Sequence, residues 1–200
     1  MATLATTVDI ASLPWVIGDL VTGTRGGGKS ATITQPSGPI RFQLCPLATG
    51  LRAPWGASSF QGQEATKLNL DLSLDSAELL AWCDSLDEWL VAAITEHSER
   101  LFKKRMTEQQ VRAQYRPLVA RKEGSSYAPT LKTKINLSSV RCWTPAGERI
   151  EASEVNWKRS LLCPCVSVRQ LWFVSRLVGL TLDVTDVVVH PSEEESFPFM

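Results

Sequence analysis

Strict alternation of apolar and polar residues marks two segments as strands with one face in the core. In KLNLDLSL, residues 67–74, four leucines fall on one face. In TLKTKINL, residues 130–137, Lys132 and Lys134 fall on the face opposite the apolar side chains. A period of two is that of a half-buried strand, so we expect both lysines to be exposed.

Glycine, proline and β-branched residues predict further strands on either side of these two. Residues 15–23 and 30–35 form an expected hairpin, closed by the glycines at 26–28, which tolerate positive φ. Other strands are expected at residues 39–45, 140–143, 148–151, 162–169, 171–176 and 179–189. The stretch 46–66, which carries Trp55 and Phe60, is rich in Pro, Gly, Ala and Ser and predicts an ordered loop.

One long amphipathic helix is predicted between the two alternating segments. Asp75, followed three residues later by Glu78, resembles a capping box, and apolar residues then recur at spacings of three and four. The pattern predicts a helix over about residues 76–104, with His97 on its apolar face. A short second helix, capped at residues 107–110, is expected to end before the next proline.

These elements predict an α+β, mainly β fold, and an OB-like antiparallel barrel with one long helix inserted between strands is our first choice. The 200 residues fit one domain, expected over residues 1–190, followed by an acidic, disordered C-terminal tail at 191–200. Hydrophobic residues make up 44% of the chain and charged residues 21%, which is the composition of a globular protein, so intrinsic disorder is excluded for most of the chain. We expect no signal peptide or membrane span, and therefore an intracellular protein without membrane contact.

The formal net charge is zero, but the charges are segregated along the chain. Residues 71–99 carry −8, residues 100–176 carry +11 and residues 183–200 carry −5. Neutrality alone argues against a nucleic-acid ligand, whereas these blocks predict a basic β half beside an acidic helix and an acidic tail. The basic half is therefore where we expect an anionic partner to bind.

The string GTRGGGKS, residues 23–30, satisfies the P-loop pattern. A functional P-loop needs a helix that begins at the Lys-Ser pair, because the helix N-terminus and the loop amides hold the phosphates. Here Lys29 and Ser30 are followed by β-branched residues and Pro36, which disfavour a helix. We expect a basic hairpin loop whose Arg25 and Lys29 contact nucleic-acid phosphates, with nucleotide hydrolysis as an unfavoured alternative.

Cysteines and histidines form no recognisable metal or catalytic motif. The five cysteines are an odd set, which is typical of free thiols in a reducing compartment. Cys163 and Cys165 lack both the usual zinc-knuckle spacing and a second pair, so buried strand cysteines are favoured over a zinc site. His97 and His190 lie in no nucleophile motif. We predict a protein that is not an enzyme and uses no cofactor or metal.

Basic and aromatic side chains interleave along the C-terminal half, on strands and loops of one predicted sheet. Single-stranded nucleic acid requires this combination, with cations for the phosphates and flat rings on which bases stack. The alternative is a solvated charged face over a core that contains the tryptophans, and chemistry alone does not separate the two. Trp172 and Arg176 are expected to share one face of a strand. The predicted DNA-binding residues are Arg25, Lys29, Arg116, Lys122, Tyr127, Lys132, Lys134, Arg141, Trp143, Lys158, Arg159, Trp172 and Arg176.

The last residues combine acidic side chains with aromatic ones. They are Glu193, Glu194, Glu195, Phe197 and Phe199. Such a segment is suited to occupy a basic groove as a mimic of phosphates and bases, or to bind a partner such as a replication protein. A solubilising terminus is the alternative.

The order of the elements resembles a known family. The segments that carry the likeness are, in order, GGGKSATITQPSGPIRFQLCP, LRAPWGASSF, KLNLDLSL, the long helix, YAPTLKTKI and LWFVSRLVGLTLDVTDVVV. Together they are similar to the OB-fold single-stranded DNA-binding proteins of large nucleocytoplasmic DNA viruses and their protist relatives. It is more distantly similar to the single-stranded DNA-binding protein of short-tailed phages. The likeness covers residues 15–200 and implies cofactor-free coating of unwound DNA during replication, recombination or repair, in the nucleus or at a viral replication site. It also implies that residues 127–134 and Trp172 line the groove and that the tail at 193–199 competes for it.

We therefore predict a non-catalytic protein that binds single-stranded DNA largely without sequence preference. Binding of RNA and a homodimeric state stay open. The alternatives are a protein-interaction β-domain without nucleic-acid binding and, less favoured, a P-loop nucleotide hydrolase that uses residues 23–30.

Overall fold

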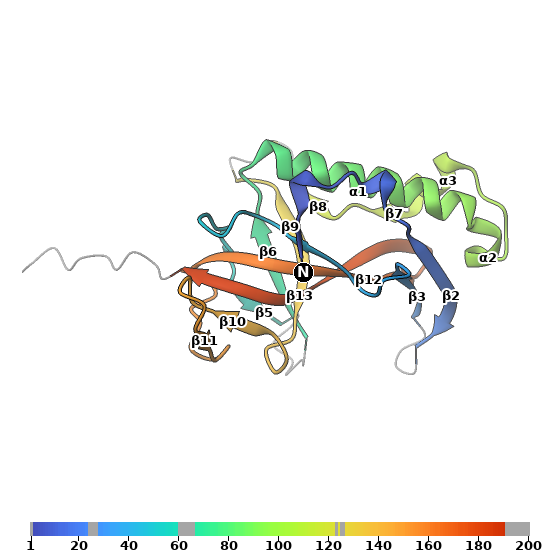
Figure 1. Ribbon diagram of the computed structural model, residues 1–200. Helices are drawn as coiled ribbons and strands as arrows, with labels where there is room; N and C mark the ends of the chain where they lie inside the picture. Colours follow the sequence, from blue (N-terminus) through green and yellow to red (C-terminus); the bar gives the residue numbers. More distant parts are fainter. Residues whose placement is uncertain (1, 24–27, 60–66, 123, 125–126, 191–200) are drawn as a thin grey trace, which may run out of the picture.

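The computed structural model describes residues 2–190 except 24–27, 60–66, 123 and 125–126 (Figure 1). The strands are β1 Thr3–Leu4, β2 Val16–Thr22, β3 Lys29–Thr34, β4 Ile40–Gln43, β5 Ala57–Ser58, β6 Leu68–Ser73, β7 Tyr115–Arg116, β8 Val119–Ala120, β9 Thr130–Ile135, β10 Arg141–Trp143, β11 Arg149–Ile150, β12 Leu161–Val174 and β13 Leu177–His190. The helices are the short 3₁₀ turns η1 Ala5–Thr7 and η2 Ile10–Ser12, and α1 Ala77–Glu96, α2 Ser98–Phe102 and α3 Glu108–Gln114. The predicted α+β, mainly β class is confirmed.

A long antiparallel hairpin, β12 with β13, organises the sheet. Each of its strands has 14 residues, and the sheet order is β1-β4-β12-β13-β9-β6-β5. The β2–β3 hairpin adds to the far half of β12, while β7 and β10 pair in parallel with β13. Figure 1 shows the hairpin crossing the molecule below α1, with β2 and β3 at one end and β10 and β11 at the other.

The sheet is open, so the prediction of a closed OB-like barrel is wrong. Among the described residues, no pairing joins β1 to β5, the two outer strands of the sheet order. β1 has only two residues and lies parallel to β4, and β5 has two residues against β6. Such short edges offer too few backbone groups to close a barrel. Closure depends on pairing between remote segments, which periodicity along the chain does not report.

The two strands predicted at 162–169 and 171–176 are one strand, β12. Strand β12 pairs with β13 along its whole length, and two bulges interrupt the register where the apolar and polar residues cease to alternate. The turn that follows consists of Ser175 and Arg176, at φ 49° and φ 72°. Arg176 therefore lies in the turn and does not share a strand face with Trp172.

The single helix predicted over 76–104 is divided into α1 and α2. Ser76, rather than Asp75, is the N-cap, and its hydroxyl accepts the backbone N–H three residues further on at 3.2 Å. At the division, the hydroxyl of buried Ser98 accepts the N–H of Met106 at 3.0 Å, which fixes the chain where it turns back. The apolar period continues across the division, so the hydrophobic pattern does not reveal it.

The inner face of α1 packs on the sheet and closes the core. Its Leu79, Leu86, Leu90 and Ile94 are at most 1% exposed. Leu70 and Leu72 of β6 and the apolar residues of β9 are buried as the alternation predicted, while Leu68 is half-buried. Helix α3 begins with the expected capping box at residues 107–110. No described helix is long and apolar enough to cross a membrane. This core leaves the exposed faces of β6 and β9 free to build a surface site.

Candidate nucleic-acid interface

A cleft of about 1070 Å³ lies where β6, β7, β9, β12 and β13 meet. We call it the central groove; among its lining residues are Asn69, Asp71, Arg116, Lys132, Lys134 and Trp172. The three cations and Trp172 are all predicted DNA-binding residues. The leucines of β13 add an apolar floor, so the groove combines positive charge, one aromatic ring and apolar surface.

The indole of Trp172 lies against the backbone of β13 at Gly179. The two residues are cross-strand partners, and a Cβ on Gly179 would stand 2.5 Å from Cζ2 of the indole. Only glycine leaves room for the ring at this distance. On the other side of Gly179, its partner in β7 is Arg116. One row across three strands therefore places a guanidinium-bearing residue next to an aromatic ring.

Lys132 and Lys134 project from the exposed face of β9, as the alternation predicted. The Lys134 Nζ donates a hydrogen bond to Asn69 Oδ1 at 2.5 Å, and Lys132 stands opposite Asp71 in the register of β6 and β9. Burial raises the pKa of Asp71, while the positive charges of the two lysines act to lower it. Asp71 is the acidic residue that offsets part of the positive charge in the groove.

A buried carboxylate ties the β7 wall of the groove to α1. The Tyr115 Oη donates to Asp87 Oδ1 at 2.6 Å, and the Leu118 N–H donates to Asp87 Oδ2 at 3.1 Å. Burial raises the pKa of Asp87 to about 6, although both hydrogen bonds favour the charged form. Since Arg116 lies between Tyr115 and Leu118 in the chain, Asp87 positions Arg116 through its backbone.

Arg141, also a predicted DNA-binding residue, and two further arginines of the basic half pair with carboxylates of the protein. Arg141 forms a two-point ion pair with Asp186, with Nε–Oδ1 at 2.7 Å and Nη2–Oδ2 at 2.9 Å. Arg169 reaches the buried Asp183 at 3.3 Å, and Arg121 binds an aspartate of α1 at 2.7 Å. These arginines are bound to carboxylates, which leaves them less available to a phosphate than the groove cations.

The remaining predicted residues are dispersed. Trp143 is half-buried beside Arg149, whose Cζ lies 6.0 Å from the ring centroid. Trp157 is buried, and its indole N–H donates to a backbone carbonyl. Lys122, Tyr127, Lys158 and Arg159 are exposed but do not line the central groove. Arg25 and the tail residues Glu193, Glu194, Glu195, Phe197 and Phe199 lie outside the described residues.

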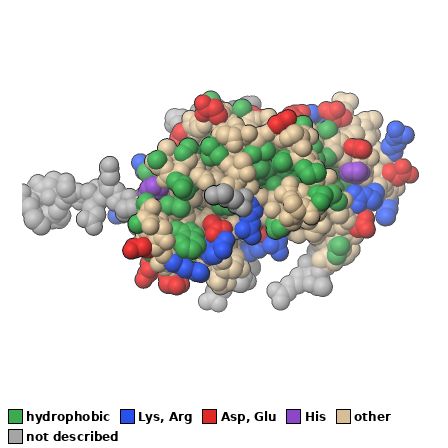
Figure 2. Space-filling view, viewed as in Figure 1, with side chains coloured by type: hydrophobic (Ala, Val, Ile, Leu, Met, Phe, Trp, Pro, Cys, Tyr) green, Lys and Arg blue, Asp and Glu red, His purple; other side chains and the backbone are tan. Residues whose placement is uncertain are grey.

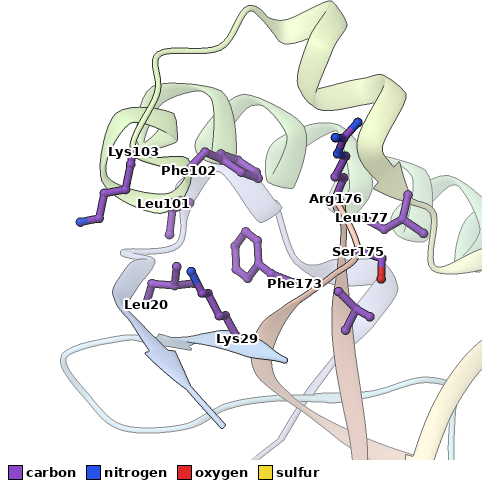
Figure 3. A pocket seen from close by; sticks show the side chains of 10 residues that line it. Leu20, Lys29, Leu101, Phe102, Lys103, Phe173, Ser175, Arg176 and Leu177 are labelled. Atoms are coloured by element: carbon purple, nitrogen blue, oxygen red, sulfur yellow. The ribbon is translucent and has the colours of Figure 1, made fainter. Parts of the chain in front are cut away.

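Lys29 and Arg176 line a second cleft, of about 300 Å³, at the turn of the β12–β13 hairpin (Figure 3). We call it the tip cleft. Val174 and Leu177 line both the tip cleft and the central groove, so the two clefts adjoin. The sequence prediction had placed Lys29 and Arg176 in one site with the groove residues; the structure separates them into this neighbouring cleft.

Basic and acidic side chains are unevenly spread over the surface. On the face shown in Figure 2, Lys and Arg side chains gather in the lower middle, over the strands, whereas several acidic side chains lie along the top, over α1. Acidic side chains also lie at the lower left of this face, and both signs mix at its right, so the segregation of charge along the chain persists only in part in space.

The P-loop alternative requires a helix that begins at Lys29 and Ser30, and the structure has a strand there. Lys29 begins β3 and no helix starts there. Cys163 is buried in β12, as expected of a strand cysteine, and His97 is half-buried where α1 ends. Within the described ranges, no group of three or more His, Cys, Asp or Glu side chains is arranged to hold a metal ion.

Sequence reasoning missed three residues that shape the groove. Gly179 makes room for Trp172, and a glycine inside a strand pattern is the signal that could have identified it. Asp87 and Asn69 gave no signal, since an aspartate in a helix and an asparagine in a strand are ordinary surface residues in a sequence. Trp55, which is 61% exposed, is an accessible ring that does not line the groove.

The sequence matches no protein-family model, and a comparison with curated proteins finds no match. Among solved structures, the chain is similar to the single-stranded DNA-binding protein from bacteriophage Enc34, with a TM-score of 0.50 and 10% identity over 91% of this chain and 96% of that chain. That phage protein in complex with single-stranded DNA gives a TM-score of 0.44, and its C-terminal truncation gives 0.45, both at 13% identity over 88% of this chain and over 97% and 96% of theirs. The first likeness shows a shared fold and confirms the predicted resemblance to a phage protein at that level. The narrower resemblance to proteins of large DNA viruses stays a prediction.

Proposed function

We propose that this protein binds single-stranded DNA in the central groove, largely without sequence preference and without a catalytic step. The observation that carries the proposal is the row Trp172–Gly179–Arg116, together with Lys132 and Lys134 on the neighbouring face of β9. The fold shared with a phage single-stranded DNA-binding protein supports it.

Each part of the groove suits one part of a nucleotide. The indole of Trp172, held on one side by the β13 backbone, offers its other side to a base, and such stacking is worth about 1–3 kcal/mol per base. Arg116, Lys132 and Lys134 bind phosphates, which are the same for every sequence. Because the base is bound by stacking rather than by its hydrogen-bonding edge, the four bases are bound with similar affinity.

This mode of binding fits a protein that coats unwound DNA during replication, recombination or repair. Stacking and phosphate contacts do not exclude RNA, so the two nucleic acids are compared in the test below. A protein-interaction domain with a basic face is the competing function, and it requires no affinity for any oligonucleotide.

The test is fluorescence anisotropy of labelled oligo-dT, and of an oligo-U of equal length, with the wild-type protein and Trp172→Ala. Loss of the stacking ring is expected to weaken oligo-dT binding by about 1–3 kcal/mol, or roughly 5- to 150-fold. Trp55→Ala is the matched control, because Trp55 is an exposed tryptophan that does not line the groove. Equal affinities for Trp172→Ala and Trp55→Ala, with both folded by circular dichroism, would remove Trp172 from the site.

A further inference from the structure

The tip cleft has the chemistry of a second nucleotide site. Lys29 of β3, Lys103 at the end of α2 and Arg176 in the β12–β13 turn surround an apolar floor that includes Phe102 and Phe173. Figure 3 shows the ring of Phe173 in the middle of the cleft with the end of Lys29 beside it, and Lys103 and Arg176 on opposite sides with their charged ends directed outward, away from the ring. The rings of Phe102 and Phe173 meet edge to face at 5.5 Å between centroids, which fixes the orientation of Phe173.

Unfavourable backbone geometry is concentrated at this cleft. Among the described residues, the non-glycine residues with positive φ are Lys103 at 58°, Ser175 at 49° and Arg176 at 72°, and all three line the tip cleft. Helix ends and two-residue hairpin turns of this kind favour Gly or Asn, because a Cβ is strained there. Strained residues that persist in one place indicate a function for their side chains. Two of the three are cations.

None of the described carboxylates neutralises the cations of the tip cleft. In the described part of the chain, Lys29, Lys103 and Arg176 make no ion pair, and no carboxylate lines the cleft. Arg100, one helical turn before Lys103, differs: it pairs with Asp19 at 3.0 Å and donates to two carbonyls of β2. Arg100 thus holds α2 against β2, whereas the three cleft cations are left for an anionic ligand.

The tip cleft adjoins the central groove. Val174 and Leu177, cross-strand partners just before and after the turn, line both clefts. A DNA strand that leaves the groove at Trp172 therefore meets the tip cleft next.

We infer that the tip cleft binds the continuation of the DNA strand held in the central groove, which rests on the proposed function. Lys29, Lys103 and Arg176 bind phosphates, and a base packs against Phe173. The site accepts any base, because its charged groups are all cations, its floor is apolar, and the hydroxyl of Ser175, the one neutral polar side chain among the described residues that line it, both donates and accepts.

The test uses a double variant, Lys103→Gly with Arg176→Gly, which removes two cations and relieves the strain at both positions. The ligands are oligo-dT of about 5 nucleotides, near the short end of the range of about 4–16 that single-strand-binding OB folds cover, and of about 20 nucleotides, longer than that range. We expect the affinity for the long oligonucleotide to fall about tenfold and its slope of log K against log salt to weaken by about 1.4, the value for two lost phosphate contacts on a single strand. Binding of the short oligonucleotide should be unchanged and the melting temperature should rise.

Lys104→Ala with Arg105→Ala is the matched control, because both are exposed cations of the same segment that do not line the cleft. Equal effects of the two double variants on long oligo-dT, or an equal loss for short and long oligo-dT in the glycine variant, would overturn the tip cleft as a continuation site. A wild-type protein that binds neither oligonucleotide would instead overturn the proposed function. If the wild-type protein binds both oligonucleotides, and Trp172→Ala weakens binding of the short oligonucleotide, the proposed function stands whatever the result for the glycine variant.

Discussion

Charged side chains are paired differently on two sides of the molecule: the helix side, formed by α1 and α3, and the groove side, which holds the central groove. On the helix side, arginines that follow α1 in the chain form ion pairs with acidic residues of α1. Arg112 joins Glu88 at 2.7 Å and Glu108 at 2.8 Å, and Arg121 joins an α1 aspartate at 2.7 Å. The pairs with Glu88 and Asp84 join α3 and the segment after β8 to α1, whereas the pair with Glu108 lies within α3.

On the groove side, the cations form no ion pair with a described residue, although Asp71 lies near the two lysines of β9. Arg116 and Lys132 form no ion pair with another described residue, and Lys134 bonds to the neutral Asn69. The basic block of +11 over residues 100–176 therefore includes arginines paired with acids of α1, arginines paired with aspartates of β13, and groove cations without an ion pair to a described residue. Net charge along the chain does not give the charge of the site.

Reversing the groove charges is expected to have the largest effect. Lys132→Glu with Lys134→Glu should weaken oligo-dT binding by about a hundredfold or more, because two phosphate contacts become repulsions. Both side chains are exposed, so the fold should persist, which thermal unfolding will check. An affinity within threefold (roughly 0.7 kcal/mol) of wild type would exclude β9 from the binding surface.

Asp87 links α1 to the β7 wall of the groove, and its contribution to the stability of the fold should depend on pH. Asp87 has a pKa of about 6 in the folded protein, above its unfolded value of about 3.9. The folded state therefore holds a proton more tightly, so this group's contribution to stability is complete below about pH 4 and is lost as the pH rises through about 6. The expected loss is about 2–3 kcal/mol.

Urea unfolding of wild type and Asp87→Asn from pH 4 to pH 8 measures that contribution. The asparagine can still accept the hydrogen bond from Tyr115 but does not titrate, so the difference in unfolding free energy between the two proteins should change across this range. A constant difference would show that Asp87 is ionised in the folded protein throughout.

Gly179→Ala should have a smaller effect, confined to the groove. The new methyl group would displace the indole of Trp172, and we expect oligo-dT binding to weaken about tenfold, within the value of one stacked base. Gly28→Ala is the control, since its Cβ would meet only an ordinary contact at 3.7 Å. If both variants bind like wild type, the ring position does not matter for binding.

The smallest effect is expected on the helix side. Arg121→Ala breaks an exposed ion pair with Asp84, so it should cost about 1 kcal/mol or less in stability and leave oligo-dT affinity unchanged. Melting temperature and anisotropy measure the two quantities. A loss of affinity as large as that of the Lys132/Lys134 variant would mean that binding follows net charge rather than the groove.

The sequence predicted those parts of the site that depend on local pattern. Alternation in β9 placed Lys132 and Lys134 on the exposed face, because the period of a strand is a local property. It did not predict that Arg176 lies in a turn or that Gly179 receives an indole, since both depend on the pairing of β12 with β13 over many residues. The division of the helix at Ser98 and the open sheet were missed for the same reason: each is decided by contacts between segments remote in sequence.

The central claim is that phosphates bind to the cations of the central groove, which form no ion pair with a described residue, and a salt titration of wild-type binding to oligo-dT tests it most directly. With Arg116, Lys132 and Lys134 on phosphates, log K should fall linearly with log salt with a slope of about −2 or steeper. The Lys132→Glu, Lys134→Glu variant should lose most of that slope. Wild-type binding that does not depend on salt, or no binding at low salt, would contradict the claim.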